Sequence, residues 1–452
     1  MEVEYTPLYS EASLIMEAGQ TTANTAWSAL IHYGENKTLE PLFTMAVNLE
    51  RDYRTSFADI ITVTVTMGLG DYARLIYPNR LGLELTLTQT DFNEMGSEIN
   101  LDGRIQSERY SAVLLDGPNS ATVGQGAESN SREALNLSQI IDVHFQLFSK
   151  SVEQIRVMLT GGIYRKCNVE EVMKTVLTRQ ALDAKLPAET ALVGIDMVPA
   201  DNKDKKGQVV FAHGTKLIDV PDTLQKRIGV YNSGLGSYIQ NKNWFIYPLY
   251  DTTDFKSRKK TVKILVMPKR KFANIERTFQ ANGDSLTILA TGETSFKDDS
   301  GTNYVNSGNG VRFGDAKSIM QNPVTVADNK VRIKRTSNNS EFISEKNDAG
   351  VNFAALSAKR ITDNPFFEYS HLAAKNGGIF KCHWENADPS LLIPGMTAKV
   401  TYMDGEDLKE LYGIIHVVQL VSFRANGFAN QRFINNVELT LFVNGQITPI
   451  TE

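Results

Sequence analysis

The chain has 452 residues, which is more than one hydrophobic core accommodates, so roughly two to four domains are expected. A hydrophobic content of 42% and a charged content of 22% are ordinary for a globular protein. The net charge of −5 argues against a dedicated nucleic-acid-binding protein, because phosphate contacts need a concentrated basic surface.

The amino terminus, MEVEYTPLYSEASLIMEAG, is acidic and lacks the basic and apolar regions of a signal peptide. No run of residues approaches the length of a membrane span. The two cysteines, Cys167 and Cys382, are too few for a disulfide framework or a cysteine-built metal site. We therefore expect the protein to be made in a reducing cytoplasm and to stay there until it is assembled into a larger structure.

Residues 1–40 are expected to mix short polar and helical patches, and four strands then follow at 60–67, 81–89, 109–115 and 139–148. The first two alternate strictly between apolar and polar residues, which predicts strands with one buried and one exposed face. The apolar residues are Ile61, Val63, Val65 and Met67 in the first strand and Leu81, Leu83, Leu85 and Leu87 in the second. The opposite face of the first strand is rich in threonine and poor in charge.

The middle of the chain combines helices and strands. Asn168 is expected to cap a helix over 168–182 with an apolar stripe of valines and Leu177, and Asp219 to cap a second helix with Pro221 in its first turn. Further strands are expected at 243–250, 260–268 and 285–290.

The sequence from 292 to 365 is dominated by Asn, Ser, Gly, Asp and Lys and is interpreted as a loop-rich insertion. The segment that follows returns to alternating strands, in MTAKVTYM, LYGIIHVVQLVSF and RFINNVELTLFV. The apolar face of the last of these strands carries Val437, Leu439, Leu441 and Val443.

Enzyme signatures are mostly missing from the sequence. VGQGAE (123–128) lacks the third glycine of a dinucleotide-binding loop, and YNSGLG (231–236) lacks the glycine of a nucleophile elbow. His371, Cys382 and His383 come nearest to a metal-ligand set, but adjacent residues on a strand point to opposite faces, so a buried cysteine beside a surface histidine is expected. We predict no catalytic residue, no cofactor and no metal.

The clearest charge feature is KSRKKTVKILVMPKRK (256–271), which has no acidic residue. Two interpretations remain open: a solvated pair of strands with basic ends, or a positive surface that meets an acidic neighbouring protein or DNA in a pore. The candidate interface residues are Lys256, Arg258, Lys259, Lys260, Lys263, Lys269, Arg270 and Lys271.

Three segments carry a family resemblance. LQKRIGVYNSGLGSYIQNKNWFIYPLYDT (224–252) resembles the segment of phage tail hub proteins that joins a helix, through a YGIYNGGLG-like turn, to a strand reading IYPLYDT. DIITVTVTMGLGDYARLIYPNRLGLELTL (59–87) resembles the first barrel of that family, and LLIPGMTAKVTYMDGEDLKELYGIIHVVQLVS (391–422) resembles its last barrel. The matching positions of the first segment are Leu224, Gln225, Gly229, Val230, Tyr231, Gly234, Gly236 and Ile246 to Thr252.

The resemblance implies a mainly β fold (α+β overall) with two tube-like β-barrel domains. The expected divisions are an N-terminal segment (1–40), a first barrel (41–165), a mixed middle region (166–291), the polar insertion (292–365) and the strands of a second barrel (366–452). The implied protein is a baseplate hub of the bacteriophage virion, assembled in the host cytoplasm. Three copies, with two barrels each, would form a pseudo-sixfold ring that joins the tail tube to the central spike and lets DNA pass.

Two functions of other classes remain open. The first is a tail-associated enzyme that degrades the cell wall, although no contiguous catalytic domain is visible in the sequence. The second is a receptor- or carbohydrate-binding β-protein, for which the aromatic residues of NWFIYPLY (243–250) would be the platform. Because these aromatics alternate in a strand, about half of them should be buried, which would leave a poor surface for sugar.

Overall fold

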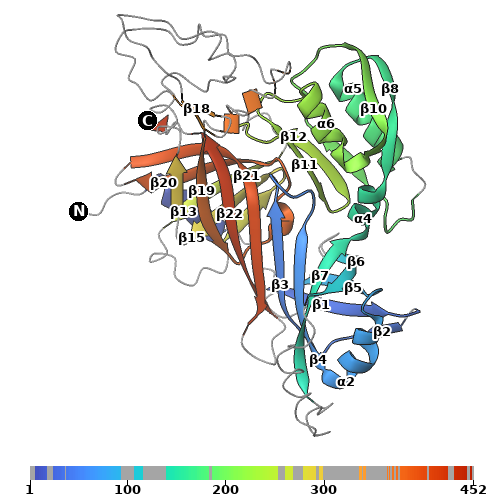
Figure 1. Ribbon diagram of the computed structural model, residues 1–452. Helices are drawn as coiled ribbons and strands as arrows, with labels where there is room; N and C mark the ends of the chain where they lie inside the picture. Colours follow the sequence, from blue (N-terminus) through green and yellow to red (C-terminus); the bar gives the residue numbers. More distant parts are fainter. Residues whose placement is uncertain are drawn as a thin grey trace, which may run out of the picture.

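The computed structural model is mainly β, and strands from both ends of the chain join in one large sheet (Figure 1). This confirms the mainly β part of the predicted fold class. The structure describes residues 6–17, 24–35, 37–92, 106–115, 139–182, 186–252, 260–267, 278–291, 295–298, 335–337, 340–342, 364, 366, 369–370, 373–374, 377–404, 407–425, 432–444 and 448–449.

The N-terminal strands form an antiparallel array in the order β3-β4-β7-β6-β5-β1-β2. A short helical crossing over residues 69–79 connects β4 to β5. The strands are β1 (Asn24–Tyr33), β2 (Lys37–Leu39), β3 (Phe43–Asp52), β4 (Ile60–Gly68), β5 (Glu84–Phe92), β6 (Gln106–Leu114) and β7 (Ile140–Ser149). Since β1 also contacts β3 and β22, this part of the sheet curves back on itself.

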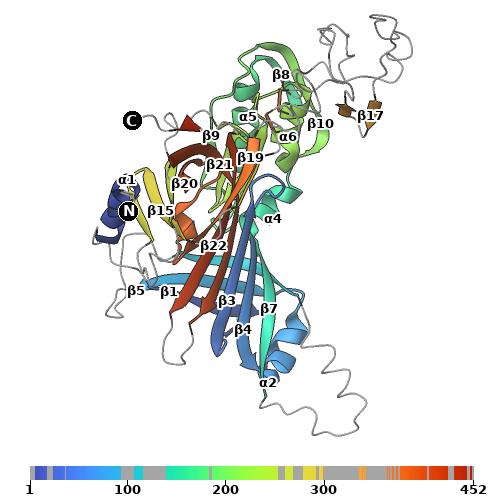
Figure 2. The same cartoon turned by 90° about the vertical axis from the view of Figure 1, so that its left-hand side faces the viewer.

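The C-terminal strands continue the same sheet. They include the parallel neighbours β15, β13 and β20, followed by the long antiparallel strands β21, β22 and β19. Their bounds are β13 (Thr261–Met267), β14 (Phe279–Asn282), β15 (Ser285–Thr291), β16 (Ser295–Asp298), β19 (Gly377–Glu385), β20 (Thr397–Asp404), β21 (Asp407–Arg424), β22 (Phe433–Asn444) and β23 (Thr448–Pro449). The helix α1 (Thr6–Glu17) packs on β13 and β15 through Leu8, Ala12 and Ile15 (Figure 2).

The middle of the chain has its own core, built from helices and two small sheets. One sheet is the pair β8–β10, and the other has the order β11-β12-β9. The elements are α4 (Lys150–Val157), β8 (Leu159–Cys167), α5 (Val169–Leu177), a π-helical turn (Thr178–Leu182), β9 (Gly194–Met197), β10 (Lys206–Lys216), α6 (Val220–Arg227), β11 (Leu235–Gln240) and β12 (Asn243–Pro248). A small hairpin of β17 (Arg335–Ser337) and β18 (Ser340–Phe342) lies within the predicted insertion.

Several local predictions are corrected. Leu81 does not share the buried face of its strand: its side chain is 96% exposed and β5 begins only at Glu84, because the turn after the helical crossing occupies this position. Asp219 does not cap α6 through its side chain, because it ends a 3-10 turn and has helical dihedral angles. Pro221 does lie in the first turn, as predicted.

Some pairings cross the expected divisions of the chain. β1, from the segment expected to be polar and helical, pairs along its length with β5. β13 and β15, which the sequence analysis groups with the middle region, pair with each other and with β20. These partners are distant in sequence, so local patterns could not reveal them.

Candidate functional site

The two ends of the chain meet where β21 pairs with β3 in an antiparallel register. Strands β19, β22, β21, β3, β4 and β7 therefore lie side by side in one surface, which we call the bridging sheet (Figure 1). The sequence suggested strands at both ends but gave no sign that they pair with each other.

The inner face of the bridging sheet is a continuous apolar layer. One row of directly opposed residues crosses all six strands without a polar member, and each of its side chains is buried. The row is Trp384, Val437, Leu420, Leu49, Ile61 and Leu147. The row continues without interruption from the C-terminal strands to the N-terminal strands, so both ends of the chain share one core. This packing fixes the position of one end relative to the other.

The outer face of the bridging sheet is partly exposed and mixes polar with apolar side chains. The neighbouring row reads Asn436, Val421, Asn48, Thr62 and Gln146 from β22 to β7. Thr64 and Thr66 bond across the strands to His144 and Asp142, at 2.9 and 2.6 Å. The threonine-rich face noted in β4 therefore belongs to this outer surface, although Thr66 itself is buried.

A buried ion pair lies below the junction of β3 with β21. Arg51 donates from Nε to Asp59 Oδ2 at 3.1 Å and from Nη1 to the carbonyl of Pro389 at 2.7 Å. Asp59 also accepts from the hydroxyl of Tyr238 at 3.0 Å. Burial disfavours the charged guanidinium, but Asp59 outweighs this effect, so the pKa of Arg51 lies above its ordinary value.

Further hydrogen bonds tie the middle region to the same junction. The side chain of Gln240 accepts from Tyr53 at 3.2 Å and donates to the carbonyl of Leu392 at 2.7 Å. The backbone of Ile239 donates to Phe57 at 2.8 Å. Strand β11 thus contacts the N-terminal and the C-terminal strands at one point, and all three parts of the chain converge here.

A small polar cavity opens beside this ion pair, between β3 and the strands β1, β5 and β6. Arg51, Asp59 and Glu108 line it together with apolar residues of the inner face. Burial raises the pKa of Glu108, which accepts from Tyr110 at 3.0 Å and from Ser149 at 3.2 Å. Each carboxylate at this cavity already has protein donors.

The segment that carries the first resemblance forms a tightly packed turn. The buried side chain of Gln225 accepts from the backbone of Val230 and Tyr231, at 2.8 and 3.0 Å, and donates to the carbonyl of Tyr231 at 2.9 Å. A Cβ at Gly236 would lie 2.4 Å from the ring of Tyr247, so the close approach of strand and ring requires glycine. The matched residues therefore act in packing and turn formation.

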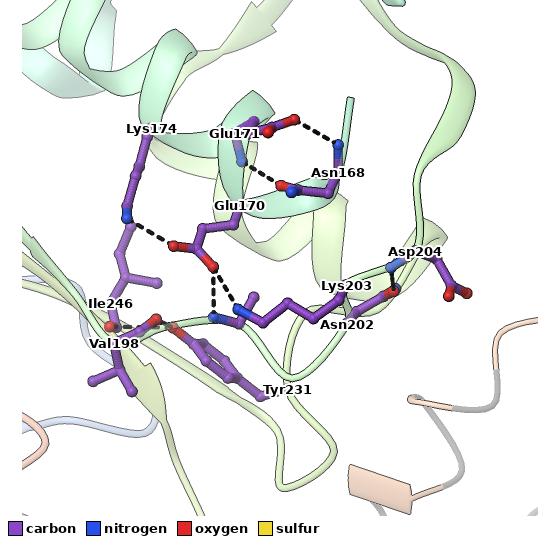
Figure 3. Close-up of polar contacts among 11 residues, drawn as sticks. Asn168, Glu170, Glu171, Lys174, Val198, Asn202, Lys203, Asp204, Tyr231 and Ile246 are labelled. Carbon is purple, nitrogen blue, oxygen red and sulfur yellow. Dashed lines mark hydrogen bonds and ion pairs between the residues drawn. The ribbon is translucent and has the colours of Figure 1, made fainter. Parts of the chain in front are cut away.

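The loop before β10 is held by Glu170 of α5 (Figure 3). Its carboxylate accepts from Lys174 at 2.7 Å, from Lys203 at 2.9 Å and from the backbone of Ala200 at 3.1 Å. Burial acts against the carboxylate, but these hydrogen bonds outweigh it and lower the pKa of Glu170 to about 2. Asn168 and Glu171 form the reciprocal cap that begins α5, so the predicted capping role of Asn168 is confirmed.

The predicted basic interface is only partly visible. Of its eight residues, Lys260 and Lys263 lie within the described part, and the other six, Lys256, Arg258, Lys259, Lys269, Arg270 and Lys271, lie outside it. Lys260 is exposed just before β13, and Lys263 lies 3.4 Å from Glu11 of α1. The interface therefore stays a prediction.

The aromatic segment of β12 does not form an exposed platform. Trp244 and Tyr247 are buried, with 1% and 2% exposure, and Phe245 is half-buried. Cys382 is fully buried while His383 is partly exposed, as the alternation of the strand predicts. Within the described ranges no group of three His, Cys, Asp or Glu residues is arranged to hold a metal ion, and no helix is long and apolar enough to cross a membrane.

No family model matches the chain, and no curated protein matches it. Among solved structures, it is similar to the tail protein from Neisseria meningitidis MC58, with 8% identity, a TM-score of 0.42 and coverage of 92% of this chain and 96% of that one. The 43 kDa tail protein of prophage MuSo2 from Shewanella oneidensis shows 7% identity and a TM-score of 0.43, with 91% of this chain and 98% of that one covered.

A third similar structure is the E. coli c3393 protein, a component of the type VI secretion system. It shows 10% identity and a TM-score of 0.36, and the comparison covers 96% of this chain and 76% of that one. At these identities and scores the similarity assigns no residue a role.

Proposed function

We propose that this chain is a structural subunit of a phage tail hub, three copies of which form a ring between the tail tube and the central spike. The observation that carries the proposal is the pairing of β21 with β3, which joins strands from the two ends of the chain into one bridging sheet. Of the three sequence segments that resemble tail hub proteins, one includes β4 and another includes β21 of this sheet. The third includes Tyr247, which donates to the carbonyl of Tyr53, and Leu249, whose carbonyl accepts from His416 of β21.

The shared apolar row explains how one chain supplies two similar wall segments. Each end of the chain contributes antiparallel strands with one buried and one exposed face, and their inner faces form a single core. A rigid pair of wall segments, repeated three times, would give the six segments that match a sixfold tube. The two tube-like barrels of the resemblance are part of this proposal.

The outer face of the bridging sheet has the chemistry expected of a wall along which DNA moves. DNA is held by arginine and lysine through its phosphates, so a wall that must release DNA should present few free cations. Lys381, on this face, is paired with Glu438 at 3.0 Å. The remaining surface combines neutral amides and hydroxyls with exposed apolar side chains such as Val421 and Phe423 and with carboxylates such as Glu50 and Asp142, none of which attracts phosphate.

The proposal is tested by native mass spectrometry of the purified chain, alone and with its tail partners, followed by negative-stain imaging. A trimer with a threefold ring is the expected result, and a species that stays monomeric under both conditions would overturn it. Val421→Arg together with Asn48→Arg should leave the trimer intact but slow DNA release from assembled particles. The matched pair Lys37→Ala with Arg74→Ala alters exposed residues away from the bridging sheet and should change neither property.

A further inference from the structure

The middle region carries an exposed surface that neither the sequence analysis nor the proposed ring uses. It is the outer face of the antiparallel pair β8–β10, which we call the ribbon. Its inner face, with Val209 and Phe211, belongs to the core beneath α5 and α6. Since these helices cover only one side, the opposite side of the ribbon faces outward.

The outward side presents a small apolar centre. Ile163 and Val210 lie directly opposite each other in the register and are 57% and 45% exposed. Leu159, farther along β8 on the same side, is 58% exposed. A two-stranded ribbon that is apolar on both faces is unusual for a solvated surface, because alternation normally places polar residues outside.

The ribbon is also strongly basic within an acidic chain. Neither strand contains an aspartate or glutamate, whereas Arg165, Lys166, Lys206 and Lys216 give it four positive charges. Lys206 has a distant partner in Asp204, at 3.7 Å, and no salt bridge to Arg165, Lys166 or Lys216 is present among the described residues. An apolar centre surrounded by cations is complementary to an apolar patch surrounded by carboxylates.

The edges of the ribbon are poorly suited to adding another strand. The register of β10 against β8 shifts between Phe211 and Thr215, and lysines stand at the strand ends. Bulges and lysines are the usual means by which open edges avoid pairing with other chains. Docking therefore involves the face of the ribbon, through side chains.

The same charges decide against a symmetric dimer through this face. A twofold contact would bring the positive charges of one copy against those of another, and like charges across an interface cost free energy. We infer that the β8–β10 ribbon is a docking surface for a different protein, one that presents an acidic surface with an apolar centre. The inference does not depend on the ring.

A photoreactive amino acid at position 210 of the full-length chain provides the test. The chain is produced together with the proteins encoded beside it in its genome, and cross-linked products are identified by mass spectrometry. We expect one specific adduct, to an acid-rich segment of another protein. A second probe at position 113, where Val113 is 49% exposed on β6, controls for chance contacts.

Charge reversal separates docking from a solvated ribbon. The triple change Arg165→Glu, Lys166→Glu and Lys216→Glu should lower the yield of the adduct by about tenfold or more, as should an increase in salt from about 0.05 to 0.5 M. The control triple Lys37→Glu, Arg74→Glu and Arg227→Glu changes the charge equally at exposed sites elsewhere and should leave the yield unchanged.

The outcomes are distinct. A thermal unfolding curve that matches the wild type shows that the triple variant is folded. Loss of the adduct in that folded variant supports the inference. It is overturned by the absence of an adduct, by an adduct only to a second copy or to nucleic acid, or by an adduct that persists in the charge-reversed protein.

Discussion

Arg51 and Asp59 form a buried ion pair, with side chains that are 6% and 17% exposed, at the point where three distant parts of the chain converge. Arg51 comes from β3, next to its junction with β21, and also bonds to Pro389. Asp59 also accepts a hydrogen bond from the hydroxyl of Tyr238 in β11. The pair therefore couples the packing of the bridging sheet to that of the middle region.

Replacing one member of this pair should be strongly destabilising. Arg51→Met leaves Asp59 as a buried charge without its counter-charge, for which we expect a loss of about 3–5 kcal/mol. The double change Arg51→Met with Asp59→Leu removes both charges and should cost less than the sum of the single changes, by about 0.5–3 kcal/mol. Urea unfolding of the four proteins measures this difference, and strictly additive losses would show that the two groups are not coupled.

The inner face of β4 should not tolerate charge. Val65 is fully buried opposite Val143, so Val65→Asp places a carboxylate in the core and should cost several kcal/mol. Asn48→Asp, on the outer face of the neighbouring strand, should change stability by about 0.5 kcal/mol or less. Chemical denaturation compares the two, and equal stabilities would show that the faces are assigned wrongly.

The parts of the fold that sequence predicts are those with strong local patterns. The alternation in β4 and β22 places Val63 and Leu439 in the core, and the structure confirms that both are buried. The cap at Asn168 also follows from local sequence, since both of its hydrogen bonds are made within one turn.

The features that sequence missed depend on contacts between distant segments. No local sequence pattern around Arg51 indicates that its side chain donates to the carbonyl of Pro389. Likewise, no pattern around Leu49 indicates that Leu420 lies opposite it in the neighbouring strand. The strands β8 and β10 alternate only weakly, because β8 has two consecutive glycines inside it and β10 has glycines and polar residues near both ends, so the sequence does not predict the ribbon. The only feature of the sequence that indicates this basic surface is the absence of acidic residues from both strands.

The turn that resembles tail hub proteins should depend on Gln225. Gln225→Leu removes the acceptor for two buried backbone N–H groups and the donor to Tyr231, and each unsatisfied group costs about 1–3 kcal/mol. Gln225→Glu keeps the acceptor, and when its carboxyl is protonated it can also donate to Tyr231, so it should be less harmful at acidic pH than at neutral pH. The midpoint of thermal unfolding distinguishes them, and a leucine variant as stable as the wild type would refute a structural role for this side chain.

The two interpretations of the basic segment at 256–271, an interface or a solvated surface, predict different effects of charge reversal. Reversing Lys259, Lys260, Lys269 and Arg270 to glutamate should leave the isolated fold intact, because exposed charges add little to stability. If the segment is an interface, the variant should bind a neighbouring tail protein more weakly, and wild-type binding should fade as salt rises. Assembly at wild-type yield, with unchanged salt sensitivity, would favour the solvated interpretation.

Acid should destabilise the protein through His416. This histidine lies at the bulge of β21, stacks on Phe442 and donates from Nε2 to the carbonyl of Leu249 at 2.9 Å. Burial lowers its pKa from 6.5 to about 4, although the hydrogen bond to Leu249 opposes the change, and Arg54 and Asp52 have smaller, opposite effects.

Because the folded pKa is lower than the unfolded pKa, the unfolded chain binds more protons between these values, and stability rises with pH across the window. The contribution of His416 should be fully present above about pH 6.5 and lost as pH falls to about 4, for a total of roughly 3 kcal/mol. The carboxylate of Asp52 does not obscure this window, since its own pKa is lowered below 3.8 despite burial, by hydrogen bonds from Arg54 and Thr55.

The test is urea unfolding at a series of pH values for the wild type and for His416→Gln, which cannot titrate but can still donate to Leu249. In the variant, the free energy of unfolding should rise less steeply with pH between pH 4 and 6.5 than in the wild type, whatever its stability at neutral pH. His213→Gln replaces an exposed histidine on β10 and should keep the full slope. Parallel pH profiles for His416→Gln and the wild type would show that this buried ring does not take up a proton on unfolding.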